Sequence, residues 1–534
     1  MINFFERKPI LTIIVVSFLL LLPNLNFLEV TIMEARNFIT AREMLTDGNW
    51  VLTTMNGEAR YEKPPLPTWL TAISSMIFGV KSLWGLRLPA ALTVTLLSVF
   101  VYMLSRKLNH SKTTSLHNGL IALTSLYVIV IIFEAPWDIY THAFMLIGIY
   151  GMLTLFRKNV WSWKAALYIV MGVSASVLSK GPISFYALLL PFLLSYGICY
   201  RKELSGKQWL RVLSMMVLGL GLGFSWYIYV RYVDPDTFNR IAEEETGNWT
   251  SFNVRPFYYY WSFFTQSGLW TIPAFISLLY PYLKTRVHNL KGYQFTLLWT
   301  LLGVLLLSVI PEKKSRYLMP VLIPLALNTG YYIDYLVRKF KELKDKRETI
   351  PVYFNFGLVG AVLALAPLAI LIYLLSKGET LWWYSYPLVL PSLIAGFYLF
   401  KFLIRKELHK VLYTLIVTLI AIIPFWLSVQ QYFKHNPMLY NFDDDIPLYS
   451  FELDCPEMWY FIGRKAPNFG TKETLKYPEE TSFLFLDYVV DGHKRHKQYL
   501  KEYDLEILDT IDLNNPNQRR RNRKWMNVIK ATKR

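Results

Sequence analysis

Cysteine is scarce in this 534-residue chain, and charged residues are few for its length. The two cysteines, Cys199 and Cys455, fall on opposite sides of the membrane in the topology derived below, so we predict neither a disulfide nor a thiolate metal site. Charged residues make up 18% of the chain and hydrophobic residues 54%, a balance that excludes an ordinary soluble protein of this size. The chain also has no convincing internal repeat and no low-complexity tract.

What the sequence has instead is a series of apolar stretches, several of them near the length with which a helix crosses the hydrocarbon core of a bilayer. Hydropathy predicts about thirteen such spans. They cover residues 9–28, 84–105, 119–134, 137–156, 165–179, 182–200, 212–230, 260–283, 295–310, 318–337, 352–375, 387–400 and 411–429. We expect the first span to remain as an anchor, because no small-residue cleavage site appears from Glu29 onward.

The net charge of +18 is distributed in a way that argues against nucleic acid as a partner. Lys and Arg gather in every second loop, at residues 7–8, 106–112, 157–164, 201–211, 284–291, 338–347 and 401–410. This alternation is the positive-inside pattern of a multi-pass protein. It predicts a bacterial inner-membrane protein with a cytoplasmic N-terminus and, after an odd number of spans, an extracytoplasmic C-terminal tail.

Two domains are expected, a transmembrane domain over 1–429 and a small extracytoplasmic α/β domain over 430–534. The tail predicts strands at 449–453, 482–490 and 505–508 and a helix at 493–502. The fold class is therefore an all-α polytopic membrane protein with a small C-terminal α/β domain.

The first outer loop, residues 29–83, has structure of its own. Apolar residues at helical spacing over 32–45 predict an amphipathic helix suited to the membrane interface. Asn56-Gly57 predicts a turn, and Pro64, Pro65 and Pro67 a rigid start to the next apolar helix.

Charged residues beside the spans are expensive, so those at the outer boundary are candidates for function. The outer side should carry few Lys and Arg, yet five cations stand there next to span ends: Lys63, Lys180, Lys313, Lys314 and Arg316. Their convergence would form an anion site. A carboxylate beside it could take a proton from an acceptor while the cations stabilise a leaving phosphate, as a glycosyl phospholipid donor would need.

Several motifs in the first outer loop resemble one family. They are Glu34-Ala35-Arg36, Ala41 to Leu45, Gly48-Asn49-Trp50, Asn56-Gly57 and Tyr61 to Pro65. The loop resembles that of polyprenyl-phosphate-sugar-dependent glycosyltransferases of the GT-C fold, in glycosyltransferase family 39, the relatives of protein mannosyltransferases and lipid A aminoarabinose transferases. The resemblance continues, in the same order, through Arg87-Leu88-Pro89, Asp138, Lys180-Gly181-Pro182 and Lys313 to Leu318.

The resemblance implies a catalytic base in the first loop. The family motif reads Asp-Glu with Arg two residues later, and its Asp is the favoured base; here Met33 occupies that position and Glu34 remains. Three interpretations stay open: Glu34 is the base, Asp138 is the base, or transfer chemistry is lost.

The resemblance also implies the substrate contacts. Glu62 and Lys63 would line the cavity, with Lys63 near the lipid phosphate, and Arg36 would lie beside them. The phosphate and sugar contacts would be completed by Lys180, Lys313, Arg316 and Tyr317.

Structural roles compete with each of these assignments. Glu34 could pair with Arg36 on a helix surface, Glu62 could pair with Lys63 or Arg60, and Asp138 could cap the helix that begins there. His142 lies one turn from Asp138, which could be a metal pair or a polar contact. No cofactor is firmly implied, and a divalent metal ion stays open.

The predicted activity is transfer of a sugar from an undecaprenyl-phosphate-linked donor to a lipid, protein or glycan acceptor at the outer face of the inner membrane, with inversion at the anomeric carbon. The expected partners are that donor, its acceptor and membrane lipids. A transporter or flippase of lipid-linked glycans and a catalytically inactive relative are the alternatives.

Overall fold

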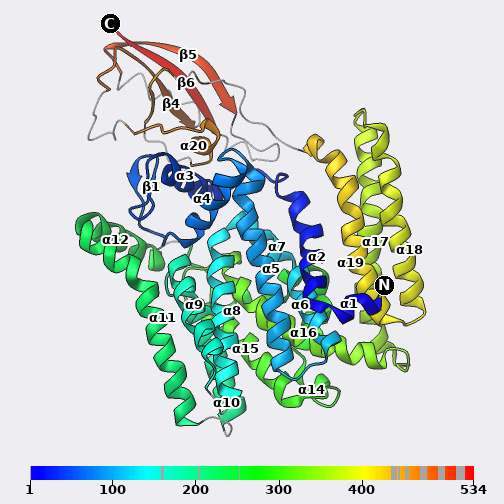
Figure 1. Cartoon of the computed structure of the whole chain (residues 1–534). Helices are drawn as coiled ribbons and strands as arrows, with labels where there is room; N and C mark the ends of the chain where they lie inside the picture. Colours follow the sequence, from blue (N-terminus) through cyan, green and yellow to red (C-terminus); the bar gives the residue numbers. More distant parts are fainter. Residues whose placement is uncertain are drawn as a thin grey trace.

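The computed structural model is mostly helical, with a small β-sheet unit above one end of the helical body (Figure 1). It describes residues 2–157, 161–201, 205–251, 253–433, 442, 445–451, 456–468, 478–490, 500–512 and 524–534. Cys455 and most of the helix predicted at 493–502 lie outside the described residues.

The N-terminal part contains the first outer loop. Its elements are α1 (Ile2–Arg7), α2 (Pro9–Leu21), α3 (Ile32–Thr46), β1 (Thr54–Met55), β2 (Glu58–Ala59) and α4 (Leu66–Phe78). The Asn56-Gly57 turn is confirmed: both residues have positive φ, 57° and 85°, and they join β1 to β2 as an antiparallel hairpin. The Glu43 carboxylate accepts hydrogen bonds from the backbone of both turn residues, at 2.6 and 3.2 Å, which fixes the hairpin on α3.

The helix predicted at 32–45 is confirmed as α3, but its surroundings differ from the expectation. Its polar face is buried, because α20 (Pro456–Ile462) packs on it from above and α4 from the side. Ile39 joins the core of the sheet unit, and the Arg42 Nη1 donates to the Trp459 carbonyl oxygen at 3.2 Å. α3 therefore connects the helical body to the C-terminal unit.

The helical body follows. Its helices are α5 (Leu83–Lys107), α6 (Lys112–Thr124), α7 (Leu126–Glu134), α8 (Pro136–Arg157), α9 (Trp163–Lys180), α10 (Leu190–Tyr200), α11 (Gly206–Val233), α12 (Pro235–Ser251), α13 (Thr271–Ser277), α14 (Tyr280–Leu283), α15 (Leu290–Val309) and α16 (Met319–Lys339). Three further helices, α17 (Lys346–Ser376), α18 (Leu390–Ile404) and α19 (Leu408–Val429), stand together at one side (Figure 1).

Helices α8 and α9 pack with their backbones in close contact. A Cβ atom added to Gly172 would lie 2.4 Å from the Gly148 backbone nitrogen, so only glycine fits there. Thr141 and Ser176 each donate a side-chain hydrogen bond to the other's carbonyl oxygen, at 3.0 and 2.7 Å. The two helices are antiparallel, so the first turn of α8 meets the last turn of α9.

Seven helical segments of the described chain are long and apolar enough to cross a membrane. They are Leu83–Lys107, Pro136–Arg157, Gly206–Val233, Leu290–Val309, Lys346–Ser376, Trp383–Ile404 and Leu408–Phe433. An eighth results if α6 and α7, bent by 41° at Ser125, count as one span. Each of these segments overlaps one of the thirteen predicted spans, and only 295–310 extends beyond its helix, by one residue.

Other predicted spans are interrupted. Residues 260–283 form no single helix but short pieces, η4 (Phe257–Tyr260), η5 (Phe263–Trp270), α13 and α14, with Gly268 at φ 62° breaking the helical path. Residues 182–200 begin with the π-helical turn η2 (Phe185–Leu189) before α10. Composition reveals how apolar a segment is, but it does not reveal such breaks.

The C-terminal unit is a four-stranded sheet with order β3-β4-β6-β5, in which β3 runs parallel to β4 and the other pairs are antiparallel. Its strands are β3 (Leu448–Phe451), β4 (Ser482–Val490), β5 (Tyr503–Asp512) and β6 (Lys524–Lys533). The sequence predicts the bounds of β4 and the centre of β5 correctly and misses β6 and α20. The face of the sheet that carries Leu484, Leu486 and Met526 packs with α20 and Ile39 of α3.

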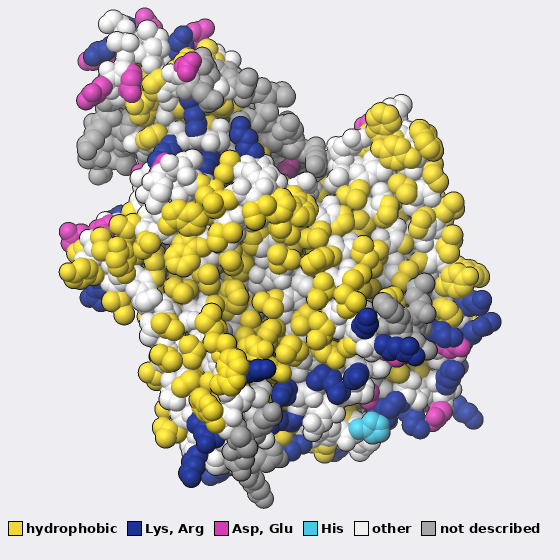
Figure 2. Space-filling view, in the orientation of Figure 1, with side chains coloured by type: hydrophobic (Ala, Val, Ile, Leu, Met, Phe, Trp, Pro, Cys, Tyr) yellow, Lys and Arg dark blue, Asp and Glu magenta, His cyan; other side chains and the backbone are white. Residues whose placement is uncertain are grey.

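Hydrophobic and charged side chains occupy different parts of the surface of the helical body (Figure 2). On the face shown in Figure 2, hydrophobic side chains cover the middle of the body, and Lys and Arg gather at the end away from the sheet unit. This distribution is expected of a multi-pass membrane protein.

Candidate functional site

The candidate site begins with a buried ion pair between α8 and α9. The Lys180 Nζ donates to the Asp138 Oδ1, and the two residues are 9% and 2% exposed. The close antiparallel packing of the two helices places them opposite each other. Among the described residues the Asp138 carboxylate caps no backbone N–H, so capping is the wrong interpretation.

The second oxygen of Asp138 faces a cation from another part of the chain. η6 (Ser315–Leu318) places the Arg316 Nε 4.0 Å from the Asp138 Oδ2, too far for a hydrogen bond. Both atoms are buried, and neither has a hydrogen-bond partner among the described residues. A buried acceptor and a buried donor that face each other across such a gap fit a bridging polar group.

Tyr317 and Lys63 extend the cluster. The Lys180 Nζ lies 5.6 Å from the centre of the Tyr317 ring. The charges of Lys63 and Arg316 both act on the Lys180 ammonium. The Tyr317 hydroxyl donates to the Glu312 Oε1 at 3.1 Å. Burial raises the pKa of Tyr317, so the phenol stays neutral. Three cations therefore converge beside one carboxylate.

The loop after β2 is held at the site by Arg60. Its Nη1 donates to the Arg36 carbonyl oxygen and the Thr40 hydroxyl, both at 2.8 Å, and its guanidinium lies 5.1 Å from the Trp137 ring. Burial lowers the pKa of Arg60 to about 10, which leaves it charged at neutral pH. Its Nε lies 4.0 Å from the Glu62 Oε2.

Lys63, next along this loop, pairs with the Glu245 Oε2 of α12 at 3.2 Å. Both residues are partly exposed, so the pair can open for a ligand. Arg36 lies close enough for its charge to act on Arg60. Of the predicted contacts, Arg36, Glu62 and Lys63 thus gather at one edge of the site, and Lys180, Arg316 and Tyr317 surround Asp138.

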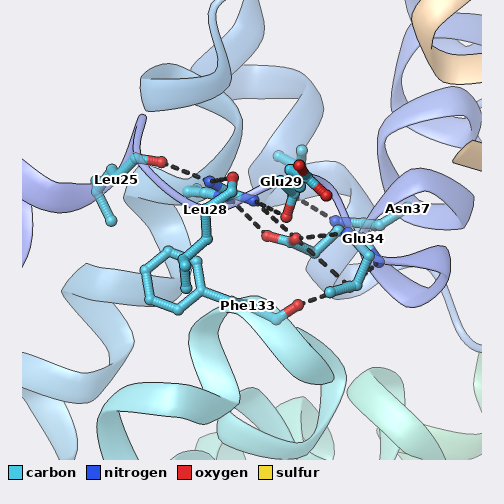
Figure 3. A network of polar contacts seen from close by, with 9 residues as sticks. Leu25, Leu28, Glu29, Glu34, Asn37 and Phe133 are labelled. Carbon is cyan, nitrogen blue, oxygen red and sulfur yellow. Dashed lines mark hydrogen bonds and ion pairs between the residues drawn. The ribbon is translucent and has the colours of Figure 1, made fainter. Parts of the chain in front are cut away.

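Glu34 has a different position. Both of its oxygens bind the Arg87 guanidinium, at 2.6 and 2.9 Å, and both side chains have no exposed surface. Arg87 also donates to the carbonyl oxygens of Leu25, Leu28 and Glu29 (Figure 3). The surface pairing with Arg36 is therefore wrong.

Glu34 also completes the N-terminal cap of α3. It accepts from the Thr31 backbone N–H, and the Thr31 hydroxyl in turn bonds the Phe133 carbonyl oxygen at 2.7 Å (Figure 3). Burial raises the pKa of the Glu34 carboxyl, an effect that Arg87 and Thr31 oppose. The contacts of Glu34 hold the start of the first outer loop.

Lys313 does not join the cations around Asp138 through any contact of the described residues. Its Nζ donates to the carbonyl oxygens of Arg255 and Ile310, at 3.1 and 2.5 Å. Burial lowers the pKa of this ammonium. These bonds fix the segment after α12 against the segment after α15.

Glu245 and Glu312 are partners that sequence reasoning did not select for the site. Glu245 belongs to the acidic run 243–245, and Glu312 pairs with Lys314 at 2.6 Å and with Tyr317. The only signal in the sequence is their place beside span ends. Their partners Lys63 and Tyr317 come from the packing of distant segments.

The alternative of a metal pair at Asp138 and His142 gains no third ligand: among the described residues, the two belong to no set of three His, Cys, Asp or Glu ligands within 4.8 Å of one another. The His142 Nδ1 is buried without a hydrogen-bond partner in the same part of the chain.

Comparison with known proteins shows what the chain and its fold are similar to. Residues 62–226 match the dolichyl-phosphate-mannose-protein mannosyltransferase family model. The crystal structure of ArnT from Cupriavidus metallidurans bound to undecaprenyl phosphate superposes with a TM-score of 0.68 over 97% of each chain, at 16% identity. The chain has the GT-C fold.

The GT-C fold is accompanied by sequence similarity to named enzymes. An undecaprenyl phosphate-alpha-4-amino-4-deoxy-L-arabinose arabinosyl transferase of Enterobacter sp. (strain 638) is 26% identical over 63% of this chain. An uncharacterized protein of Aquifex aeolicus (strain VF5) is 27% identical over 68% of it. These alignments span 60% and 68% of the relatives' own length. The predicted resemblance to polyprenyl-phosphate-sugar-dependent GT-C glycosyltransferases is confirmed.

Proposed function

We propose that this chain transfers a sugar from an undecaprenyl-phosphate-linked donor to an acceptor at the outer face of the bacterial inner membrane. One observation carries the proposal: the buried Asp138 has one oxygen on Lys180 and another that faces Arg316 across a gap of 4.0 Å. An acceptor hydroxyl can bridge that gap, because it donates to the Asp138 oxygen and accepts from the Arg316 Nε. The relatives, which include an undecaprenyl phosphate-aminoarabinose transferase, support the same chemistry.

In this proposal Asp138 is the general base. Its free oxygen accepts the proton of the acceptor hydroxyl or amine as the acceptor atom bonds to the anomeric carbon. The bond from that carbon to the phosphate oxygen breaks, and its electron pair stays on the phosphate. A single displacement of this kind inverts the anomeric centre.

The cations receive the developing phosphate charge. Arg316 is suited to bind two phosphate oxygens at once, while Lys63 and Lys180 act as point charges. Tyr317, whose ring packs against Lys180 and whose hydroxyl donates to Glu312, would contact the sugar or phosphate as a neutral side chain. Arg36 and Glu62 would line the entrance.

Glu34 and Lys313 take positioning roles in this assignment. Glu34 is occupied by Arg87 and Thr31, and Lys313 by two carbonyl oxygens. Breaking either set would leave buried charge without compensation, which argues against a proton transfer or a phosphate contact there. The departure at Met33 is then consistent with activity, since Asp138 lies outside that motif.

We further propose that residues 1–429 cross the membrane about thirteen times and that 430–534 form an extracytoplasmic α/β domain. Two shorter apolar helices, Pro9–Asn24 and Phe185–Tyr200, correspond to predicted spans beyond the seven or eight long segments. The gathering of Lys and Arg at one end of the body supports a cytoplasmic location for that end (Figure 2). A transporter of lipid-linked glycans is not favoured, because the site charges cluster at one end of the body.

The test is sugar transfer in proteoliposomes that contain purified protein and defined undecaprenyl-phosphate sugars, with the 4-amino-4-deoxy-L-arabinose donor first. Wild type should release undecaprenyl phosphate and modify an acceptor lipid or peptide. Asp138→Asn should reduce the rate by about 100-fold or more, the usual contribution of a general base. Glu244→Gln, on an exposed pair with Arg240, is the control and should transfer normally. Absence of transfer with every polyprenyl donor would contradict the proposal.

A further inference from the structure

A second cluster of ligating side chains lies away from the Asp138 site, where three helices that are distant in the sequence meet. Glu6 of α1, His117 of α6 and His409 of α19 each place one ligand atom within 4.8 Å of the other two. The His409 Nε2 lies 2.6 Å from the Glu6 Oε1. Lys410 follows His409 directly, so the cluster is near the Lys- and Arg-rich end of the body.

His117 provides an independent observation. It is 4% exposed, and its Nε2 is buried with no hydrogen-bond partner among the described residues. A buried imidazole nitrogen without a partner costs free energy, because water no longer bonds it. Its ring lies 5.7 Å from the ring of His409, centre to centre. The orphaned nitrogen therefore belongs to a residue that already borders the other two ligands.

We propose that Glu6, His117 and His409 bind one divalent transition-metal ion of the zinc class. Two imidazoles and one carboxylate are a donor set that Zn²⁺ accepts, with a fourth position left for another group. The Tyr413 hydroxyl donates to the Glu6 Oε1 at 3.1 Å and so borders the cluster, and it or a water molecule could fill that position.

The geometry needs only side-chain adjustment to receive the ion. Ligands about 2.0–2.1 Å from a tetrahedral ion lie roughly 3.3 Å apart. In this cluster one pair of ligand atoms is 2.6 Å apart and all three lie within 4.8 Å of one another. Glu6 and His409 are partly exposed and have room to rotate. The Glu6 carboxylate offsets part of the ion's charge, and Asp334, paired with Arg338 at 2.9 Å, adds a negative charge that acts on His117.

The ion would fasten separate parts of the fold. α19 belongs to the group α17–α19, which stands at one side of the body (Figure 1), and α1 is the first helix of the chain. A metal held by one residue from each of α1, α6 and α19 would tie both elements to the body. The site is therefore structural and independent of the proposed transfer reaction.

The experiment uses the full chain, purified in detergent without a polyhistidine tag and stripped with a chelator. Zn²⁺ and Co²⁺ are titrated by calorimetry and visible absorption. Wild type should bind about one ion per chain with the Co²⁺ spectrum of a tetrahedral site, and its Tm should rise with added metal. Glu6→Gln and His409→Gln should each weaken binding at least about tenfold and remove the Tm increase.

His288→Ala, an exposed histidine between α14 and α15, is the matched control and should bind as wild type. If His117→Asn fails to fold, the Glu6 and His409 variants still decide the question, since both residues are partly exposed. Binding that is absent in wild type, or that survives both variants unchanged, would overturn the proposal.

Discussion

Two buried carboxylates, Glu34 and Asp138, each pair with a cation, yet the two regions differ in how completely the carboxylate is satisfied. Glu34 has both oxygens bound by Arg87 and one also by Thr31. Asp138 has Lys180 on one oxygen and only a distant Arg316 facing the other. A carboxylate with both oxygens hydrogen-bonded, as at Glu34, holds a loop in place. A carboxylate oxygen without a hydrogen bond, as at Asp138, can receive a ligand.

The largest effect should come from neutralising the Asp138 pair. The double variant Asp138→Asn/Lys180→Met removes both charges together, so no unpaired buried charge remains and the protein should fold with a Tm near wild type. Transfer should fall by about 100-fold or more, because the base is gone. Proteoliposome transfer and thermal unfolding of the same preparation check this. Transfer within a few-fold of wild type would show that Asp138 is not the base.

Neutralising the other pair should give the opposite pattern. Arg87→Met alone leaves Glu34 buried without its cation and should lower the free energy of unfolding by about 3–5 kcal/mol. Glu34→Gln/Arg87→Met should recover part of that loss, because no unpaired charge remains although the Arg87 bonds to three carbonyl oxygens stay lost. It should keep transfer within about tenfold of wild type per folded molecule, since neither side chain would touch substrate. Thermal unfolding with and without the second substitution measures the recovery. A double variant that is stable but inactive would assign Glu34 to the chemistry.

The gap between Asp138 and Arg316 can be probed by Arg316→Lys. Lysine keeps the charge but loses the planar fork, so kcat/KM for the donor should fall by roughly 10- to 100-fold with little change in Tm. Lys313→Met is the contrast: it removes bonds to Arg255 and Ile310 and should lower Tm while KM for the donor stays the same. If Lys313→Met instead weakened donor use and Arg316→Lys only lowered Tm, Lys313 and not Arg316 would be the phosphate contact.

The smallest effect should come from the packing that presents Asp138 to Lys180. Gly172→Ala places a methyl group against the Gly148 backbone and should destabilise the fold by about 1–3 kcal/mol, with a partial loss of transfer. Gly221→Ala on α11 meets no atom within 4 Å and is the matched control. Equal Tm values for the two variants would show that the α8–α9 contact is not what sets the ion pair.

Part of the site was readable from the sequence and part was not. Thr31 and Glu34 have the spacing of a capping box, a local signal for the structural role of Glu34. Arg87, its other partner, lies 53 residues further along, and Lys63 and Glu245 are 182 residues apart, so only tertiary packing joins them. The sequence identifies which charges stand at span ends, but it does not show which of them meet.

The fold, like the site, was predicted from the sequence only in part. Uninterrupted apolar segments such as 84–105 and 352–375 correspond to single helices, because length and composition decide them. Residues 260–283 are less apolar and break at Gly268, which has φ 62° and where an added Cβ would lie 2.7 Å from the Leu126 Cβ. Strand β6 was not predicted from the sequence; Lys524, Lys530 and Lys533 interrupt its apolar residues.

The most direct test compares the single variants Asp138→Asn and Glu34→Gln in the same vesicles, with turnover expressed per folded protein and undecaprenyl phosphate binding measured alongside. Asp138→Asn should bind undecaprenyl phosphate within a few-fold of wild type but transfer about 100-fold more slowly or worse, while Glu34→Gln should transfer at a rate near wild type with a lower Tm. Loss of turnover in Glu34→Gln, with Asp138→Asn still active, would contradict the assignment of Asp138 as the base.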